Sequence, residues 1–283
     1  MPDPQKMLAT IQKAIQILKQ QPGRVGKYVE LQDADEIIIL GDLHGNLTNF
    51  KKLHELAKLD KHPKRHLVVQ ELVHGPFSYT NDGGETSHRL VDIVCAYICQ
   101  FPFRVHYLLG NHELSQWTRR EIGKNNESLN ELFSKGVSTA YPHHTEAFLT
   151  AYDQLFSALP AAIRLPNAVF ISHSMPAASR LLDWEVDDLK KAQHTDEDFK
   201  IGGAVHGIVW GRDTSEFTVS TFLDIVNSEL LISGHIPNEK GFETPNKYQI
   251  ILDGTIENPP ALLFSTREKQ TQQKLLDSMK WLK

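Results

Sequence analysis

Four short aliphatic segments of this chain are each followed directly by polar residues of the kinds that bind metal ions. The segments are 37–40, 105–109, 168–171 and 230–232, and the residues after them are Asp42, His44, Asn111, His112, His173 and His235. Aliphatic runs of this length are typical of buried strands. Because ligands of open α/β sheets bind beyond the carboxyl ends of the strands, residues far apart in sequence can meet at one edge. The pattern predicts a layered α/β protein with one polar site.

The rest of the chain alternates between strand-like and helical patterns, as layered α/β proteins do. Further strands are expected at 67–69, 208–210, 250–252 and 261–264, and helices at 49–59, 87–99 and 147–159. We expect an amphipathic helix within residues 1–21 and a helical insertion with loops at 114–141. The tail 266–283 reads as helical, with one apolar face made of Leu275, Leu276, Met279 and Leu282. Without an internal repeat or a long linker, residues 1–283 are expected to form a single domain.

Composition narrows the classes of function. The 283 residues are 40% hydrophobic and 23% charged, which argues against intrinsic disorder. A net charge of −5 gives no basic field for nucleic acid or anionic lipid, and no apolar run approaches the roughly 18 residues that cross a bilayer. We therefore expect a cytoplasmic protein that binds neither. Cys95 and Cys99 lie four apart in an apolar segment and are expected to be reduced thiols rather than a disulfide or zinc site.

The polar residues form a plausible set of metal ligands. Asp42 and His44 are separated by one residue on a turn that begins and ends in glycine, so both side chains can reach one cation. With Asn111, His173 and His235 the set is too large for one tetrahedral zinc and suits two divalent ions. A pair of ions needs a bridging carboxylate. Glu71 follows the segment 67–69 and is the acid placed at a strand end between these motifs.

These motifs, in this order, resemble the calcineurin-like metallophosphoesterases, and within them the phosphoprotein phosphatase branch that includes serine/threonine phosphatases. The resemblance spans positions 36 to about 264: Gly-Asp-x-His-Gly begins at 41, Gly-Asn-His-Glu at 110, and a later Gly-His at 234. The sequence LFSALPAA at 155–162 is similar to the segment before the third metal motif of the family. The resemblance implies a four-layer α/β/β/α sandwich that hydrolyses phosphate monoesters of a phosphoprotein or a small molecule.

The resemblance also implies roles for individual residues. Asp42 and His44 would hold the first metal ion, and Glu71 would bridge the two ions. The second ion would be held by Asn111, His173 and His235. Manganese, iron or zinc suits this ligand set. A hydroxide bridging the ions would attack phosphorus, and His112, with Glu113 behind it, would protonate the departing alkoxide as general acid.

The second motif departs from the family pattern Gly-Asp-x-x-Asp-Arg-Gly, since residues 70–76 read Gln-Glu-Leu-Val-His-Gly-Pro. Glu71 is one methylene longer than the bridging aspartate. The acid that orients the catalytic histidine in the family is His74 in an ungapped alignment, whereas Asp82 supplies it if 73–81 is an insertion. His74 is otherwise expected on a loop or in a satisfied pocket, as are His143, His144 and His206.

The arginine that binds phosphate in the family is Gly75 here. Losing it removes bidentate, charge-assisted hydrogen bonds to the phosphoryl group. Arg212, which follows Trp210-Gly211, is the first candidate to take its place. The other candidates are Arg89, Arg119 and Arg120.

Two further functions stay open on the sequence alone. A dinucleoside polyphosphate hydrolase on the same fold is one, because the sequences at 234–237 and 251–254 also resemble that branch. A degenerate, non-catalytic protein that binds phosphorylated ligands is the other, because the second motif is altered.

Overall fold

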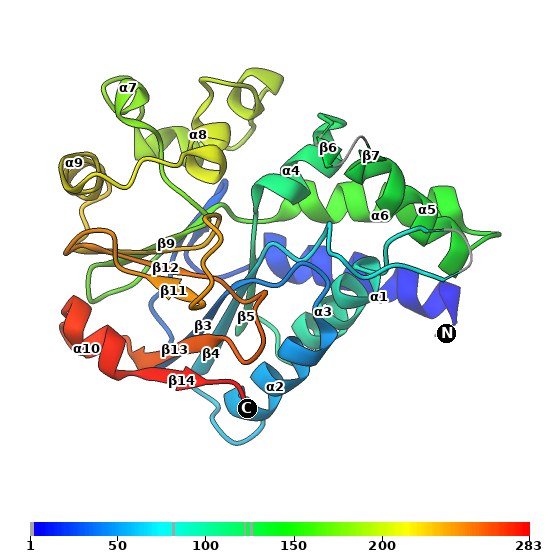
Figure 1. Cartoon of the computed structure of the whole chain (residues 1–283), viewed down its shortest axis with the longest axis horizontal. Coiled ribbons are helices and arrows are strands. Elements are labelled where there is room, and N and C mark those ends of the chain that lie inside the picture. The colour runs from blue at the N-terminus through cyan, green and yellow to red at the C-terminus, as the bar shows by residue number, and fades with distance from the viewer. Residues whose placement is uncertain (1–2, 81–82, 122, 125–126) are drawn as a thin grey trace.

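Two β-sheets lie face to face with helices on both outer sides in the computed structural model, which describes residues 3–80, 83–121, 123–124 and 127–283 (Figure 1). This is the expected four-layer α/β/β/α arrangement. The five-stranded sheet has the order β14-β13-β3-β4-β5 and the seven-stranded sheet the order β1-β2-β8-β9-β10-β12-β11. Within them β3, β4 and β5 are parallel, as are β9, β10 and β12, so their carboxyl ends share one edge.

The strands are short, between two and seven residues. The five-stranded sheet consists of β3 (Glu36–Asp42), β4 (Arg65–Gln70), β5 (Val105–Leu108), β13 (Pro260–Ser265) and β14 (Met279–Trp281). The seven-stranded sheet consists of β1 (Arg24–Val25), β2 (Tyr28–Glu30), β8 (Ala162–Arg164), β9 (Val169–Ser172), β10 (Leu230–Ser233), β11 (Phe242–Glu243) and β12 (Gln249–Leu252). A separate hairpin pairs β6 (Gly123–Lys124) with β7 (Glu127–Ser128).

Alternation along β3 shows how one strand serves two cores. Ile37 and Ile39 are buried in the core between the sheets, whereas Ile38 and Leu40 are buried in the core beneath the helices. Successive side chains of a strand point to opposite faces, so a strand covered on both faces is apolar throughout. This is why the segment 37–40 is a continuous aliphatic run.

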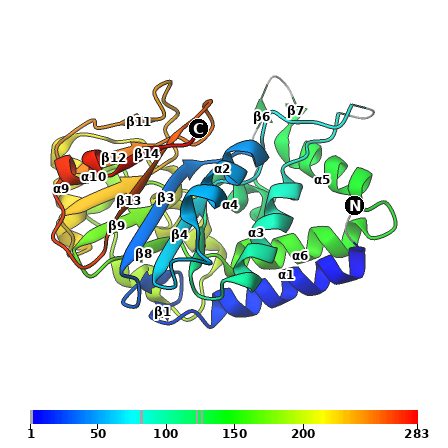
Figure 2. The same ribbon diagram turned by 90° about the horizontal axis from the view of Figure 1, so that it is seen from below.

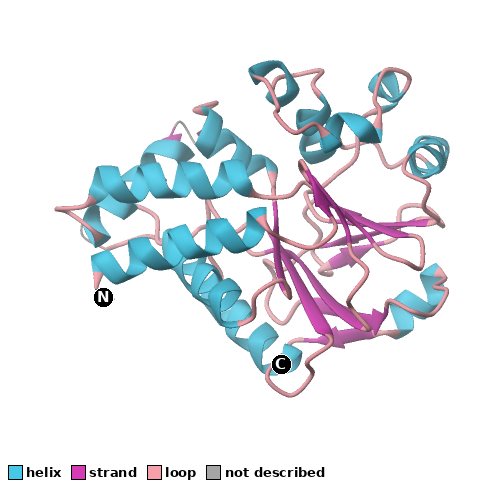
Figure 3. Ribbon diagram, turned by 180° about the vertical axis from the view of Figure 1, so that it is seen from behind, coloured by secondary structure: helices cyan, strands magenta, loops and turns pink. Residues whose placement is uncertain are grey.

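Most of the helices gather on one side of the molecule (Figure 2, Figure 3). On this side lie α1 (Pro4–Lys19), α2 (Leu47–Ala57), α3 (His88–Gln100), α4 (Asn111–Thr118), α5 (Leu129–Ala140) and α6 (Thr145–Ala158). The far side of the seven-stranded sheet is covered by α7 (Ala178–Leu181), α8 (Ala204–Trp210), α9 (Glu216–Ile225) and the 3₁₀ turns Val186–Lys190 and Asp196–Phe199. There Phe222 of α9 meets Phe170 of β9 edge to face, with ring centroids 5.5 Å apart.

Two sequence-based expectations about elements are wrong. Residues 208–210 are not a strand but the end of α8, because a short apolar run fits a buried helix as well as a strand. In the tail only α10 (Gln272–Asp277) is helical, and β14 then pairs antiparallel with β13. Met279 and Leu282 therefore do not share a helical face with Leu275. Pairing with an available sheet edge outweighs the weak helical pattern of this tail.

Other expectations about local structure are confirmed. Helix α1 begins after Asp3, whose carboxylate accepts hydrogen bonds from the amides of Gln5 and Lys6. The insertion 114–141 contains the end of α4 and the whole of α5. Cys95 is buried, Cys99 is half-buried, and both are free thiols. Over the part of the chain that the structure describes, no helix is both long and apolar enough to cross a bilayer.

Candidate metal centre

The ends of five strands bring the predicted ligands together. Asp42 ends β3, Glu71 follows β4, and His173 follows β9. His235 lies two residues beyond β10, and its main-chain N–H donates to Oδ2 of Asp42 at 2.9 Å across 193 residues of sequence. Asn111 is the first residue of α4, directly after the loop that leaves β5. The shared edge of the sheets therefore forms one site, as the strand-end pattern predicts.

His173 lies at the centre of this site and shows the need for a cation. Its Nε2 is 2.9 Å from Oδ1 of Asn111 and 2.7 Å from Oε2 of Glu71, and its ring is fully buried. Its Nδ1 lies 2.9 Å from Oε1 of Gln70. With a proton on Nδ1 to donate to Gln70, the Nε2 lone pair faces two further oxygen lone pairs. A divalent cation among these three atoms would convert a repulsive cluster into a coordination sphere.

Two other histidines are held in the same orientation. Nδ1 of His44 lies 2.8 Å from the carbonyl oxygen of Val73. The main-chain carbonyl of Trp210 hydrogen-bonds the imidazole of His235, whose Nε2 is buried and has no partner in the described part of the chain. An oxygen acceptor on Nδ1 fixes the tautomer that leaves Nε2 free, which is the usual support for a histidine ligand.

Glu71 lies between two groups of potential ligands. One group is His44, Glu71 and His112, the other is Asp42, Glu71 and His173, and within each group the ligand atoms lie within 4.8 Å of one another. Oδ1 of Asp42 and Oε2 of Glu71 are buried and accept no hydrogen bond from any described residue. Buried carboxylate oxygens are normally paired or bind metal ions. The residues present therefore fit two divalent cations that share one carboxylate.

Several site residues have a left-handed backbone. The φ angles are 40° at His44, 48° at Glu71, 62° at His74 and 69° at His235. Non-glycine residues in this region carry a cost of order 1–3 kcal/mol each and cluster at functional sites. At Glu71 this conformation, together with Gly110, accommodates the longer acid, since a Cβ at position 110 would lie 2.0 Å from Oε2 of Glu71.

Burial sets the electrostatics of the metal-free site. It raises the pKa of Asp42 well above its usual range, with Glu71 and Asp253 adding to the effect, and it raises the pKa of Glu71 to about 7. It lowers the pKa of His173 to about 3 and that of His235 to about 2. The imidazoles are therefore neutral and ready to bind metal, whereas the two carboxylates destabilise each other until a cation neutralises them.

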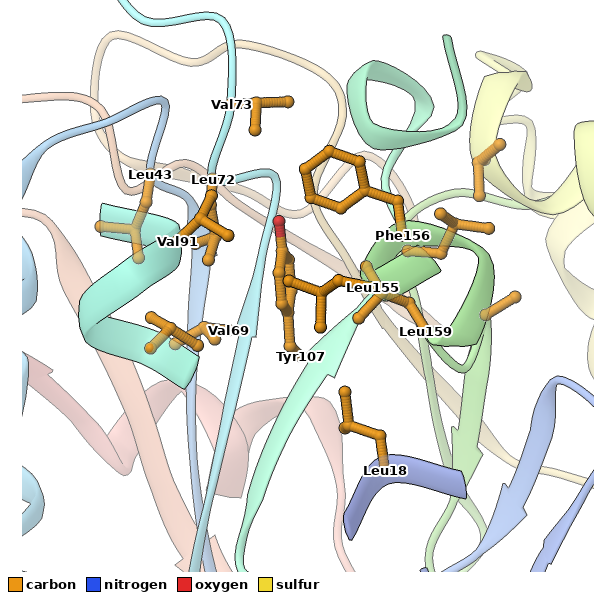
Figure 4. Close-up of a cluster of buried hydrophobic side chains, with 14 of the residues drawn as sticks. Leu18, Leu43, Val69, Leu72, Val73, Val91, Tyr107, Leu155, Phe156 and Leu159 are labelled. Atoms are coloured by element: carbon orange, nitrogen blue, oxygen red, sulfur yellow. The ribbon is translucent and has the colours of Figure 1, made fainter. Parts of the chain in front are cut away.

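Glu113 fixes the loop that carries Glu71. Its Oε1 accepts hydrogen bonds from the amide of Leu72 at 2.7 Å and from the hydroxyl of Tyr107 at 2.8 Å. Figure 4 shows Tyr107 among the apolar side chains of this core, with Leu72 and Val73 of the loop directed into it. Leu72 and Val73 are fully buried. The divergent second motif is thus pinned by a carboxylate on one side and by the core on the other.

His112 lies at the edge of the site. Its Nε2 is 3.6 Å from Oε1 of Glu71 and its side chain is 20% exposed, so a substrate can reach it. Its Nδ1 is buried without a hydrogen-bond partner among the described residues. Burial, with the neighbouring histidines, lowers the pKa of His112 well below its usual range.

The predicted arginines have different fates. Arg212 is exposed, and its charge lowers the pKa of both His173 and His235, which places it near the cluster. Arg119 is instead paired with Asp153, and Arg89 is exposed on α3. Position 75 cannot carry an arginine, because a Cβ there would lie 1.8 Å from the carbonyl oxygen of His44. Of these three arginines, Arg212 is the best placed for phosphate.

The sequence analysis did not find two supporting residues, Gln70 and Glu85, and it did not predict the buried position of a third, His74. Gln70 orients His173, and nothing in the chain distinguishes it from a surface glutamine except its position at a strand end. His74 is not on an open loop but buried beside His112, with ring centroids 5.3 Å apart, and Glu85 lies behind it. Asp82, the proposed alternative acid, lies outside the described residues.

The family is established by comparison with known proteins. A model of the calcineurin-like phosphoesterase family matches residues 36–239. The chain belongs to this family. The resemblance seen in the motifs is thereby confirmed, and membership of this family implies divalent metal ions.

Individual relatives are consistent with this membership. A probable serine/threonine-protein phosphatase of Encephalitozoon cuniculi is 26% identical over 239 residues, which cover 79% of this chain and 47% of that protein. The chain therefore spans about half the length of this relative. Among solved structures, a protein serine/threonine phosphatase from Saccharomyces cerevisiae has a TM-score of 0.65 at 18% identity, covering 92% of this chain and 82% of that one. A cold-active protein-tyrosine phosphatase of a Shewanella species has a TM-score of 0.62 at 15% identity, covering 94% and 84%. These similarities establish the shared fold.

Proposed function

We propose that this calcineurin-like phosphoesterase hydrolyses phosphate monoesters as a metal-dependent enzyme similar to the serine/threonine protein phosphatases. The observation that carries the proposal is the position of Glu71, which belongs to two groups of ligand atoms at once. Two neighbouring cations that share a carboxylate suit the displacement of an alkoxide from phosphorus. The relatives described above, which include serine/threonine phosphatases, support the substrate class.

The ligands divide between two positions in this proposal. Asp42 and His44 would hold one divalent ion, and Glu71 would contact both. The second ion would be held by Asn111, His173 and His235. Manganese, iron and zinc all suit these oxygen and imidazole donors. When bound, the ions supply activation of water and neutralisation of phosphoryl charge.

The remaining residues bind the substrate and move a proton. His112 is partly exposed at the edge of the ligand cluster, where its Nε2–H can be donated to the leaving alkoxide. Arg212, which makes no hydrogen bond or ion pair with any other residue that the structure describes, is available for the phosphoryl oxygens. Asp213 holds this loop by accepting hydrogen bonds from the amide of Ser215 and the hydroxyl of Thr218, both at 2.9 Å.

A cavity of about 260 Å³ beside this centre would receive the part of the substrate beyond the phosphate. It is lined by His206 and Trp210, whose rings are stacked 5.8 Å apart, and by residues of α7 including Arg180. The ring of Trp210 is 6.2 Å from that of His235, so the cavity adjoins the ligands. Its mixed polar and aromatic walls suit a side chain of a phosphorylated peptide.

The test is hydrolysis by purified protein with manganese, iron or zinc added. We expect turnover of an aryl phosphate and of a phosphopeptide, and its loss in His112→Asn without loss of bound metal. Faster hydrolysis of a dinucleoside tetraphosphate than of the phosphopeptide would favour the polyphosphate hydrolase. Tight phosphate binding with no turnover of any substrate would show a non-catalytic binding protein and overturn the proposal.

A further inference from the structure

His112 differs from the other histidines of the site in how its ring is held. His44, His173 and His235 each have an oxygen acceptor that fixes the ring. Nδ1 of His112 is buried and has no hydrogen-bond partner in the described part of the chain. A general acid must present Nε2–H to the leaving group, so some group has to fix the opposite nitrogen.

His74 is the side chain placed to do so. Its ring is fully buried, with its centroid 5.3 Å from that of His112 and the two planes tilted by 53°. The ring of Phe133 also lies against His74, edge on at 6.0 Å, and offers no hydrogen bond. Both ring nitrogens of His74 are buried and lack a hydrogen bond to any described residue. Two imidazoles with buried, unpartnered nitrogens thus lie side by side.

Glu85 holds His74 from the far side. Its Oε1 lies 3.4 Å from Nδ1 of His74 and accepts hydrogen bonds from the main-chain N–H of His74 at 3.2 Å and from the hydroxyl of Ser87 at 2.6 Å. The side chain of Glu85 is only 3% exposed. A buried carboxylate directed at a buried imidazole indicates a specific pairing rather than a surface contact.

Helix α5 fixes the position of Glu85. The amide of Glu85 donates to the carbonyl oxygen of Leu132 at 3.0 Å, and a Cβ at Gly136 would lie 1.8 Å from the carbonyl oxygen of Glu85. In Figure 1 the cyan segment that follows β4 runs across to α5. The insertion that contains α5 therefore serves as the support for this carboxylate.

We propose that His74 and Glu85 are positioning residues for His112, an inference that rests on the proposed function. In this arrangement Glu85 would accept a hydrogen bond from Nδ1–H of His74, whose nitrogen lies 3.4 Å from Oε1 of Glu85, and Nε2 of His74 would accept one from Nδ1–H of His112. The protonated His112 then gives its Nε2 proton to the leaving oxygen. It is left as a neutral imidazole that keeps its proton on Nδ1. Neither His74 nor Glu85 touches the substrate or belongs to the ligand groups found among the described residues.

The surroundings of His112 explain why such a pair is useful. The titratable groups that face it are His44, His74, Glu71, His173 and His235, with Glu85 behind His74. Most of these are imidazoles, which favour the neutral form of His112. Glu71 is a carboxylate on the Nε2 side of the His112 ring. On the Nδ1 side the negative charge comes from Glu85, through His74.

The first experiment measures the ring tautomer directly in metal-free protein labelled with ¹⁵N-histidine. We expect His112 to carry its proton on Nδ1 in the wild type and to lose this preference in His74→Phe, which keeps an aromatic ring against Phe133. The tautomers of His44 and His173 should not change. An unchanged His112 tautomer in His74→Phe would overturn the proposal, and this result does not depend on any enzymatic activity.

The second experiment uses the leaving group as a probe. For the metal-loaded enzyme, Glu85→Gln and His74→Phe should lower kcat about 10- to 100-fold on an alkyl phosphate, with little change in KM. The loss should be several-fold smaller on p-nitrophenyl phosphate, whose leaving group needs little protonation. His143→Phe, a change at an exposed histidine before α6, is the matched control.

The outcomes separate this inference from the proposed function. Equal losses on both substrates, or none, in a variant that binds metal normally would overturn the positioning role. If His74→Phe does not fold, Glu85→Gln carries the same tests, because it keeps the shape of the side chain and removes only its charge. A wild type that hydrolyses nothing would refute the proposed function, while the tautomer measurement would still decide the pairing.

Discussion

The turn after β3 and the turn after β4 lie side by side at the same edge but are built differently. The turn after β3 follows the family motif, and its histidine is fixed by a main-chain carbonyl, that of Val73. The turn after β4 departs from the motif at nearly every position, yet it places Glu71 between two ligand groups. The candidate metal ligands are thus kept where the backbone supports them, whereas the proposed partners of His112 are other side chains than those of the family motif.

The difference lies in what supports each turn. The ligand histidines after β3 and β10 depend on carbonyl oxygens, which any sequence provides once the backbone has the right path. The partners of His112 are side chains, and Glu85 depends in turn on the packing of Gly136 in α5. A motif can change in sequence at little cost where the backbone supplies the hydrogen bond, but a change in a side-chain partner needs a second change to compensate.

The largest effect is expected from the family-like turn. Asp42→Ala removes a carboxylate whose Oδ1 has no hydrogen bond to any described residue and is free for a cation. We expect loss of at least one equivalent of metal and about a 10³-fold or greater fall in turnover. Elemental analysis together with aryl phosphate hydrolysis measures both. Retention of two metals and full activity would show that this turn is not part of the metal centre.

The next largest effect is expected from Gln70, which ends β4 just before the divergent turn and orients His173. Gln70→Ala removes the acceptor 2.9 Å from Nδ1 of His173, and we expect metal affinity to fall about 10- to 100-fold. Gln70→Glu keeps an acceptor oxygen and should bind metal more tightly than Gln70→Ala. Calorimetric titration of the metal-free variants gives the comparison. Equal affinities of the two variants would mean that Gln70 does not orient the histidine.

A pH-dependent effect on stability is expected from Glu71 in metal-free protein. Its pKa is raised from 4.5 to about 7, so the stability that this group contributes is greatest below pH 4.5 and is lost as the pH rises through 7. The Glu71→Gln variant has no carboxyl group at this position, so its stability does not fall for this reason as the pH rises. The free energy of unfolding of the wild type should therefore fall relative to the variant by about 2 kcal/mol between about pH 5 and about pH 8.

Urea unfolding of both proteins with a chelator present measures this difference. Saturating manganese should reverse the trend, because a bound cation stabilises the ionised carboxylate. A difference that is constant over this pH range would show that Glu71 is not buried as the structure places it.

The smallest effect is expected from replacing Arg212, the residue proposed to bind phosphate. Arg212→Ala should raise KM for a phosphate monoester about 10-fold while the bound metal is unchanged. Arg119→Ala is the matched control, because its guanidinium is paired with Asp153, and it should leave KM unchanged. An increase in KM for Arg119→Ala alone would assign phosphate binding to Arg119 instead of Arg212.

The candidate ligands could be found from the sequence because they follow strands. Asp42, Asn111 and His173 each stand just beyond an aliphatic run, and parallel strands bring such positions to one edge. His74 and Glu85 have no such signal. The path of the loop after β4 brings them together. An alignment with the family motif puts His74 at the position of the orienting acid, or Asp82 if residues 73–81 are an insertion, and neither alignment points to Glu85. The secondary-structure predictions for residues 208–210 and for the tail were wrong for a different reason. Short apolar patterns do not distinguish a helix from a strand.

The sequence by itself determined the family, the four layers and the candidate metal ligands, because these depend on hydrophobic periodicity and on ordered motifs that are local in the chain. Only the tertiary structure decided which nitrogen of each ligand histidine faces the site, why position 75 has no room for an arginine, and which groups surround His112. These properties depend on distances of a few ångströms between residues that different elements carry, and such distances exist only once the two sheets and α5 have packed.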